Sequence, residues 1–357
     1  MDYLSLILIP AMLTFFLSFL LTPLGIILAW TFGIIDDPKK NKHPKVIHTY
    51  KTPRGAGFTL FIAITIVSMV FLPQDKHLVG ILSGAAILVF FGVLDDKFNL
   101  NPYLRLAIQF LAVLVPIAAG VGIAFVTNPL GGIVNLSEPR IFLEILGKQR
   151  SILLLADIFA IFWIVSITNF VNMGAKGVDG QLSGTVAIAA IVIALLSFQF
   201  SADITEWPVV ILASIVSGAY LGFLPWHIHP QKIMPGFSGS NLAGYMLAIL
   251  AILTTTKVGT LMVALAIPLI DTGYTIIRRI VSGKSPVWGD RGHLHHRLLD
   301  LGFSKSQVAA IYWGSTAILG IAALYLNSAS KLYTIVGVAI FLGNLLLWIT
   351  YRLKSSD

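Results

Sequence analysis

The chain of 357 residues has no cysteine and very few charged residues. Without cysteine it can form no disulfide, no thiolate metal site and no cysteine nucleophile. Asp, Glu, Lys and Arg make up only 11% of the residues, whereas 57% are hydrophobic. A mean hydropathy of +0.88 is far too high for an ordinary soluble fold. The lipid bilayer must therefore be part of the solvent of this protein.

Long apolar runs divide the chain into segments that can each cross a bilayer, which takes roughly 20 mostly apolar residues. Eleven runs are predicted, approximately over residues 4–30, 55–72, 78–94, 104–126, 152–170, 184–200, 208–226, 241–255, 258–276, 308–326 and 331–351. The first run has no basic residue before it and no small-residue cleavage site, so it is predicted to be a retained helix. We expect an all-α, polytopic membrane protein with about 11 transmembrane helices, or 10, because only a short Thr-rich break separates the eighth and ninth runs.

Lys and Arg are distributed unevenly among the predicted loops. With the N-terminus outside, 18 of the 24 lie in or beside cytoplasmic segments, which satisfies the positive-inside rule. The six others are Lys76, Arg140, Lys148, Arg150, Lys257 and Lys331. Seven of the eight histidines also fall on the cytoplasmic side, so the active site is predicted there. The net charge of +8 is explained by this topology and predicts no nucleic-acid partner.

Two adjacent carboxylates, Asp95 and Asp96, follow the third apolar run. At a helix C-terminus they lie at the negative end of the macrodipole and repel each other, so a positive group is expected to compensate. Mg²⁺ prefers carboxylate oxygens and shares them with substrate phosphates. We interpret the pair as a magnesium site; the alternative is a solvated end of a membrane helix.

Two Gly-rich polar segments lie at predicted cytoplasmic mouths of the bundle. Residues 169–184 read NFVNMGAKGVDGQLSG, in which Asn and Asp offer oxygen ligands and Gly allows close backbone approach to a phosphate. A plain turn is the alternative there. Residues 235–241 read PGFSGSN and open the next apolar run. They favour an ordinary helix cap, with an anion site as the alternative.

The loop after the ninth run is the richest in titratable residues. Residues 289–297 read GDRGHLHHR, with three histidines and two arginines close together. Arg offers forked donors for phosphate recognition, and a His-rich run can alternatively bind Zn²⁺. Asp271 lies inside an apolar run, where burying a charged carboxylate costs free energy. It is therefore a functional candidate, and its expected partner is an Arg or His of this loop.

The first loop holds six basic residues between Lys39 and Arg54. Such a cluster at a cytoplasmic interface is typical of contact with anionic lipid headgroups. His48, Lys51 and Arg54 are alternatively candidates to bind a phosphate.

Taken in order, these segments resemble the polyprenyl-phosphate N-acetylhexosamine-1-phosphate transferases (MraY/WecA/TagO-like). The matching segments are 36–48, 53–57, 94–96 with Arg105, 169–180, 268–271 and 290–297. The run HLHHR followed by LLDLGFS is closer to the GlcNAc-1-phosphate branch than to the pentapeptide translocases. The resemblance covers residues 36–305, most of the chain.

The resemblance implies a reaction, its substrates and a location. The phosphate of a polyprenyl (undecaprenyl) phosphate attacks the sugar-linked phosphorus of a UDP-N-acetylhexosamine such as UDP-GlcNAc, UMP leaves, and Mg²⁺ bridges the pyrophosphate. This is the first membrane step of a cell-envelope glycan, in cell wall or polysaccharide biosynthesis, at the cytoplasmic membrane of the cell. A single integral membrane transferase domain is expected over residues 1–357, and a homodimer is left open.

The resemblance also assigns roles by position. Asp95 and Asp96 would hold or deprotonate the acceptor phosphate or support the metal, and Asn172 would contact the metal. The catalytic candidates are Asp95, Asp96, Asp271, His293, His295 and His296; the substrate-binding candidates are His48, Lys51, Arg54, Arg105, Lys176, Asp179, Arg291 and Arg297; the metal ligands are Asp95, Asp96 and Asn172.

Two positions depart from the family pattern at the implied metal site. Lys176 stands where family members carry Asp, and Phe237 stands where they carry a metal-ligating Asp. The local charge rises by about +3, which predicts weaker Mg²⁺ binding. Either Lys176 supplies the missing positive charge to a working enzyme, or the protein binds nucleotide sugar or polyprenyl phosphate without turnover.

A membrane transporter is a further alternative, since it would also have many helices and buried acids. A secondary transporter would place its polar residues near the midplane, in discontinuous helices. Here they gather in loops on one face, which favours the transferase.

Overall fold

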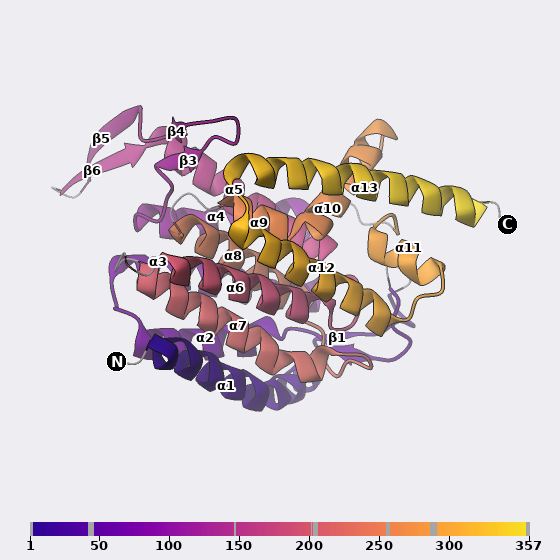
Figure 1. Ribbon diagram of the computed structural model, residues 1–357. Coiled ribbons are helices and arrows are strands. Elements are labelled where there is room, and N and C mark those ends of the chain that lie inside the picture. Colours follow the sequence, from indigo (N-terminus) through magenta and orange to yellow (C-terminus); the bar gives the residue numbers. More distant parts are fainter. Residues whose placement is uncertain are drawn as a thin grey trace.

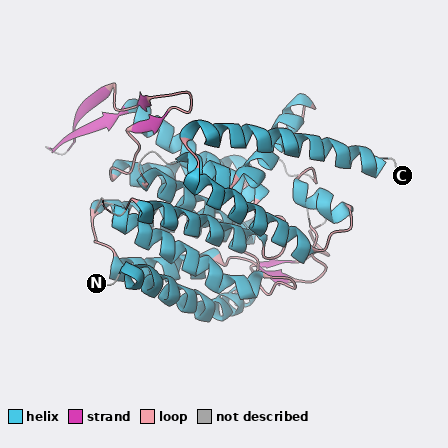
Figure 2. Ribbon diagram, viewed as in Figure 1, coloured by secondary structure: helices cyan, strands magenta, loops and turns pink. Residues whose placement is uncertain are grey.

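The protein is a bundle of long helices with short strands near its two ends (Figures 1 and 2). This computed structural model describes residues 3–41, 46–145, 148–200, 202, 206–254, 258–285 and 291–354. The helices are α1 (Tyr3–Thr31), α2 (Gly57–Phe71), α3 (Lys76–Phe98), α4 (Pro102–Ala118), α5 (Leu154–Gly174), α6 (Gln181–Gln199), α7 (Trp207–His227), α8 (Gly236–Leu253), α9 (Val258–Ala264), α10 (Ala266–Val281), α11 (Leu294–Asp300), α12 (Lys305–Tyr325) and α13 (Ser328–Lys354). The strands are β1 (Ile35–Asp36), β2 (Thr52–Pro53), β3 (Phe125–Thr127), β4 (Ile133–Asn135), β5 (Arg140–Ile145) and β6 (Lys148–Leu153).

Each of the eleven predicted runs corresponds to one helix or to one bent pair within the described residues. Eight of these helices are long and apolar enough to cross a membrane. The pair α9 and α10 meets at 81° and forms a ninth candidate, while α2 and α4 are shorter apolar helices. The prediction of an all-α, polytopic membrane protein is confirmed, and the chain is a multi-pass membrane protein.

Two predicted runs differ from the helices found. The run over 104–126 becomes a helix that ends at Ala118, because Pro116 interrupts the hydrogen-bond ladder and Gly120 takes a positive φ of 99°. The run over 258–276 is broken at Leu265. Pro268 falls in the first turn of α10, where its missing N–H is tolerated. Hydropathy alone does not detect such breaks.

Local sequence signals explain where several helices begin. The Asp75 side chain accepts a hydrogen bond from the first turn of α3, and Asn101 does the same for α4, which starts with Pro102. Ser304 and Gln307 form a capping box at the start of α12. These residues satisfy backbone N–H groups that have no partner inside the helix.

Helix α8 lies at the centre of the bundle and contacts α2, α3, α5, α6, α7 and α9. It is almost wholly buried, whereas α1 and α13 expose most of their length. Polar side chains of its first turn, Ser238, Ser240 and Asn241, are nevertheless buried. The start of α8 is therefore a polar point inside an apolar bundle.

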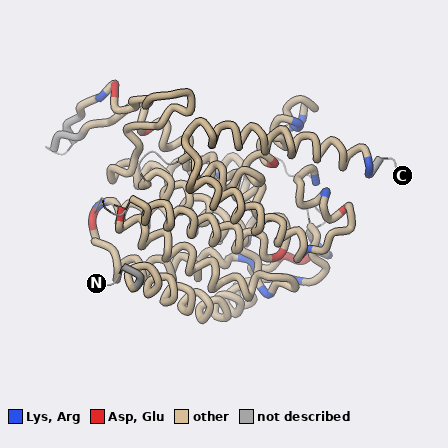
Figure 3. The backbone as a smooth tube through the Cα atoms, in the orientation of Figure 1, with Lys and Arg blue, Asp and Glu red and all other residues tan. Residues whose placement is uncertain are grey.

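The two ends of the bundle differ in structure. The paired strands β1 and β2, the short helix α11 and the last turns of α13 lie at one end, and the N-terminus and the hairpins β3–β4 and β5–β6 lie at the other (Figure 1). Charged residues concentrate towards the ends, and the long helices between them are almost free of charge (Figure 3). This distribution is expected of helices that cross a hydrocarbon layer.

The contact between α1 and α7 should be sensitive to added volume. A Cβ atom at Gly222 would overlap the carbonyl oxygen of Phe15. We expect Gly222→Ala to push the helices apart, to destabilise the protein by about 1–3 kcal/mol and to lower its thermal midpoint in detergent. Gly314→Ala is the matched control, because Gly314 is an exposed helical glycine with nothing within 4 Å of its Cβ position. Equal midpoints for the two variants would contradict the tight contact.

Candidate active site

The Asp96 carboxylate caps the N-terminus of α8. Its Oδ1 accepts from the Phe237 N–H at 2.6 Å, and its Oδ2 accepts from the Ser238 N–H at 3.2 Å and the Ser238 hydroxyl at 2.8 Å. Gly236 packs against this carboxylate with a φ of 69°, and a Cβ there would overlap its oxygens. Residues 235–241 open a helix as predicted, but its N-cap residue, Pro235, makes no side-chain cap, and the acceptor comes from outside the segment. The anion at this helix N-terminus is a side chain of α3.

The neighbouring Asp95 contacts α4 instead of α8. Its Oδ1 lies 2.6 Å from Nε of Arg105 and accepts from the Leu100 N–H at 3.0 Å. The chain reverses direction at Asn99, whose φ of 57° ends α3 and brings α4 alongside. The positive group that the sequence predicted beside the two carboxylates is Arg105 for Asp95 and the α8 N-terminus for Asp96.

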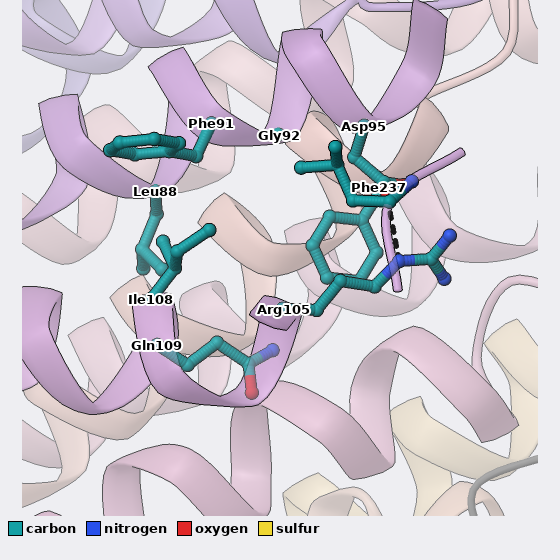
Figure 4. Close-up of a pocket in the computed structure, with 9 residues that line it drawn as sticks. Leu88, Phe91, Gly92, Asp95, Arg105, Ile108, Gln109 and Phe237 are labelled. Atoms are coloured by element: carbon teal, nitrogen blue, oxygen red, sulfur yellow. Dashed lines mark hydrogen bonds and ion pairs between the residues drawn. The ribbon is translucent and has the colours of Figure 1, made fainter. Parts of the chain in front are cut away.

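A small pocket opens beside this ion pair (Figure 4). It is lined by Leu88, Phe91, Gly92, Asp95, Leu100, Arg105, Ile108, Gln109 and Phe237. The Arg105 guanidinium carbon lies 5.0 Å from the centre of the Phe237 ring, which is a cation–π distance. The lining of the pocket is thus mostly apolar and includes one ion pair, Asp95 with Arg105.

Three amide side chains below this pocket form a network that sequence reasoning missed. Gln109 donates to Asn241 Oδ1 at 2.6 Å, and Asn169 donates to Gln109 Oε1 at 2.7 Å. The residues come from α4, α8 and α5, so the network ties three helices together at the pocket floor. Gln109 inside an otherwise apolar run was the signal that could have indicated it.

The ammonium group of Lys176 lies between α5 and the first turn of α8. Its Nζ is 2.7 Å from Asn172 Oδ1, 3.0 Å from Ser240 Oγ and 3.2 Å from the Gly236 carbonyl oxygen. Ser240 also donates to Asn172 Oδ1 at 2.6 Å. The ammonium is thus bound by oxygen atoms of both helices, and its N–H groups are the donors.

The three predicted metal ligands do not converge on one point. Asp95 faces Arg105, Asp96 caps α8, and the Asn172 oxygen accepts from Lys176. The described part of the chain holds no group of three or more His, Asp or Glu side chains arranged to bind a metal ion. A divalent ion on Asn172 would lie roughly 4 Å from an ammonium, where repulsion at an effective dielectric constant of 20 is about 8 kcal/mol. The residues here do not fit a resident Mg²⁺.

Asp271 is fully buried and holds the start of α11. Its Oδ2 lies 2.8 Å from Nδ1 of His293, and its Oδ1 accepts from the Leu294 N–H at 2.7 Å. The sequence expectation that this acid pairs with an Arg or His of the following loop is confirmed. Asp290 of the same motif lies outside the described residues.

The rings of the three histidines of this motif lie against one another beside the Gly-rich loop. The rings of His293 and His295 are 5.4 Å apart and nearly parallel, and those of His295 and His296 are 4.4 Å apart. A Cβ at Gly177 would overlap the His295 ring, so the loop passes directly against it. Burial, with the charges of neighbouring histidines and Arg291, holds the pKa of His295 well below 6.5. His295 is therefore neutral at neutral pH.

Asp179 lies in a second polar cluster next to these histidines. Its carboxylate is 2.7 Å from Nδ1 of His229, accepts from Gln231 at 3.0 Å and lies 3.4 Å from Nζ of Lys305. These three partners were not among the predicted residues. They come from the loop after α7 and from the start of α12, and only the polar composition of residues 227–232 hinted at them.

The first loop pairs its basic residues with its own acids. Arg54 lies 3.1 Å from Asp36, Lys51 lies 3.3 Å from Asp37, and Nε2 of His48 lies 4.0 Å from Asp36. Burial lowers the pKa of His48. The charge of Arg54 also acts on Asp96, so this loop borders the α8 N-terminus.

Two predicted substrate-binding arginines have structural partners. Arg297 donates to the carbonyl of Leu346 at 2.9 Å and to the hydroxyl of Thr350, which ties α11 to α13. Arg291 is 2.7 Å from Asp300 near the surface. Neither arginine contacts the Asp95, Asp96 or Lys176 groups in the interactions described above.

The buried neutral His295 predicts a pH effect on stability. Below its ordinary pKa of 6.5, the unfolded chain gains a proton that the folded protein does not. Stability should therefore fall as the pH drops from about 6.5 towards 5, by up to about 1.4 kcal/mol per pH unit for one proton. Thermal midpoints of wild type and His295→Gln over this range test it. The variant should show a smaller pH dependence, and the exposed His77→Gln should behave as wild type; identical slopes for His295→Gln and wild type would contradict this.

Comparison with known proteins identifies a family and several relatives. The family model described as glycosyl transferase family 4 matches residues 78–255, from the start of α3 to the end of α8. The chain is 28% identical over 321 residues to a probable undecaprenyl-phosphate N-acetylglucosaminyl 1-phosphate transferase of Bacillus subtilis, covering 87% of this chain and 82% of the relative. It is 28% identical over 351 residues to the decaprenyl-phosphate N-acetylglucosaminephosphotransferase of Mycolicibacterium smegmatis, covering 88% and 81%.

A further relative is the undecaprenyl-phosphate alpha-N-acetylglucosaminyl 1-phosphate transferase of Yersinia pestis, 27% identical over 301 residues, which cover 80% of this chain and 75% of that protein. The matched segment contains both carboxylates of α3, the Gly-rich loop with Lys176 and the capped start of α8. On this basis the chain belongs to glycosyl transferase family 4.

Proposed function

We propose that this enzyme transfers N-acetylhexosamine-1-phosphate, specifically GlcNAc-1-phosphate, from a UDP-sugar to polyprenyl phosphate and releases UMP. The observation that carries the proposal is that three segments that resemble the family, 53–57, 94–96 and 169–180, meet at the start of α8. They do so through Arg54, Asp96 and Lys176. The relatives described above are named as transferases of this kind. The donor UDP-GlcNAc and the acceptor undecaprenyl phosphate are proposals for this chain.

The arrangement suits phosphoryl transfer, which depends mainly on positioning and on neutralising charge. Arg105 forms an ion pair with Asp95, donates one hydrogen bond to Asn99 and lines the pocket, so most of its five N–H groups are available for a phosphate. We assign it to the acceptor phosphate, with Asp95 fixing its orientation.

The buried neutral His295 and its neighbours suit a different task. A neutral imidazole such as that of His295 can donate an N–H group to a phosphate oxygen without adding charge. We assign the stacked histidines to the donor pyrophosphate or sugar, and the Asp179 cluster beside them to the nucleotide. Asp271 acts as a positioning residue that orients His293 and the start of α11.

The proposed reaction also sets an orientation in the membrane. The end of the bundle that carries β1, α11 and the site would face the cytoplasm of the cell, where a UDP-sugar is available, and the N-terminus would lie outside. The acceptor would arrive from the cytoplasmic membrane itself. A single domain over residues 1–357, a homodimer and a role in the first membrane step of a cell-envelope glycan remain predictions from the sequence.

We assign no step to a protein-held Mg²⁺, which the family resemblance implied, because Lys176 occupies the oxygens of that position. The same observation favours a second candidate function, binding of nucleotide sugar or polyprenyl phosphate without turnover. The two functions differ in one measurable respect, the release of UMP.

Purified protein should release UMP from UDP-GlcNAc only when undecaprenyl phosphate is present. The measurement is UMP formation in detergent or in lipid nanodiscs, with other UDP-sugars in parallel. Release from another UDP-N-acetylhexosamine alone would correct the sugar. If no UDP-sugar yields UMP under any metal condition, the transferase proposal fails and the binding function is favoured.

Matched histidine variants test the site itself. His293→Ala should lower the rate of UMP release at least about 100-fold, the lower range for loss of a positioned proton-transfer or hydrogen-bonding group. The control is His77→Ala, because His77 also pairs with an aspartate, Asp75, at 3.0 Å but lies at the start of α3, opposite the site. Equal activities of the two variants would place the chemistry elsewhere.

A further inference from the structure

A group of oxygen atoms at the start of α8 holds an ammonium ion that belongs to the chain. The acceptors are the Asn172 side-chain oxygen, the Ser240 hydroxyl and the Gly236 carbonyl, all within 3.2 Å of Lys176 Nζ. Asn172 precedes Lys176 by four residues, at the end of α5. The other two acceptors belong to the first turn of α8, so two rigid helices fix the position of the charge.

These three acceptors carry no formal charge, so none of them forms an ion pair with Lys176. Its charge also acts on the buried Asp96, together with that of Arg54. The site is therefore already supplied with a cation before any substrate arrives. An additional divalent ion would meet this ammonium at close range.

The residue at position 237 fits the same arrangement. Phe237 offers an aromatic face to Arg105, and only its backbone N–H reaches Asp96. An acid here would compete with Asp96 and add negative charge at the helix start. Lys176 and Phe237 therefore act in the same direction. Lys176 adds a positive charge to the site, and Phe237 adds no carboxylate that could bind a metal ion.

We propose that the Lys176 ammonium is the resident cation for the donor pyrophosphate, so that turnover requires no divalent ion at Asn172. This inference rests on the proposed function. An oxygen of the polyprenyl phosphate forms a bond to the sugar-linked phosphorus, and the bond from that phosphorus to the bridging oxygen breaks. The electron pair leaves with UMP. Lys176 exchanges one neutral acceptor for a pyrophosphate oxygen and keeps its proton throughout.

The first test is metal dependence of the purified full-length protein. UMP release by the wild type should be the same, within about twofold, in EDTA and in Mg²⁺. Lys176→Met, which keeps the length of the side chain and removes its charge, should lower release at least about tenfold, and Lys176→Arg should retain more than Lys176→Met. Lys97→Met is the matched control, since Lys97 is an exposed lysine in the last turn of α3, and it should leave the rate unchanged.

The second test reads metal binding without turnover. Electron paramagnetic resonance of Mn²⁺, with no nucleotide present, should detect no bound ion in the wild type. The double variant Lys176→Asp, Phe237→Asp should bind Mn²⁺, because it restores two acids and removes the ammonium. Thermal midpoints of all variants identify any that fail to fold.

The outcomes separate this inference from the proposed function. UMP release that is lost in EDTA, is restored by Mg²⁺ and survives Lys176→Met would overturn the role of Lys176 and leave the transferase intact. If no UDP-sugar is turned over, the proposed function fails, and the Mn²⁺ measurement still decides the cation site. Mn²⁺ bound by the wild type and lost in Asn172→Ala would then overturn the inference.

Discussion

The capping of α8 by Asp96 is the interaction on which the rest of the site depends. A buried carboxylate needs several hydrogen-bond donors, and a buried helix start needs acceptors; each satisfies the other here. The contact fixes α3 against α8 across 141 residues of sequence. It also fixes Gly236 and Ser240, two of the three acceptors of Lys176, and directs the Phe237 ring towards Arg105.

Because Asp96 is used in this way, the two adjacent carboxylates of α3 have different environments. Asp95 meets a guanidinium at the pocket, and Asp96 meets backbone and hydroxyl groups inside the bundle. Neighbouring residues on a helix point about 100° apart, so a shared ligand would require both side chains to bend towards it. The structure instead separates a pocket-facing acid from a structural one.

Much of the fold followed from the sequence because membrane helices obey a simple rule. Apolar length predicted each of the eleven segments, and capping residues such as Asp75 and Ser304 mark where helices begin. The break at Leu265 was missed because the apolar run continues through it. Hydropathy measures transfer to lipid, whereas a bend depends on backbone geometry.

The contacts of the site were predictable where burial of a charged side chain required a partner of opposite charge or a hydrogen-bond donor. Asp271 inside an apolar run required a cation or a donor, and His293 is that donor. The partners of Asp179 were not predictable, because His229 and Lys305 lie 50 and 126 residues away and only tertiary packing brings them together. Gln109 could have been noticed as a lone polar residue among apolar ones. Its two amide partners depend on how α4, α5 and α8 cross.

The link between Arg297 and the carbonyl of Leu346 has a consequence for how the protein matures. Of the helices described, α13 is made last by the ribosome, while α11 is made before it. The start of α11, with its histidines, acquires this anchor only after α13 has entered the bundle. A chain interrupted during synthesis would therefore carry almost every site residue and still lack the contact that holds one wall of the site in place.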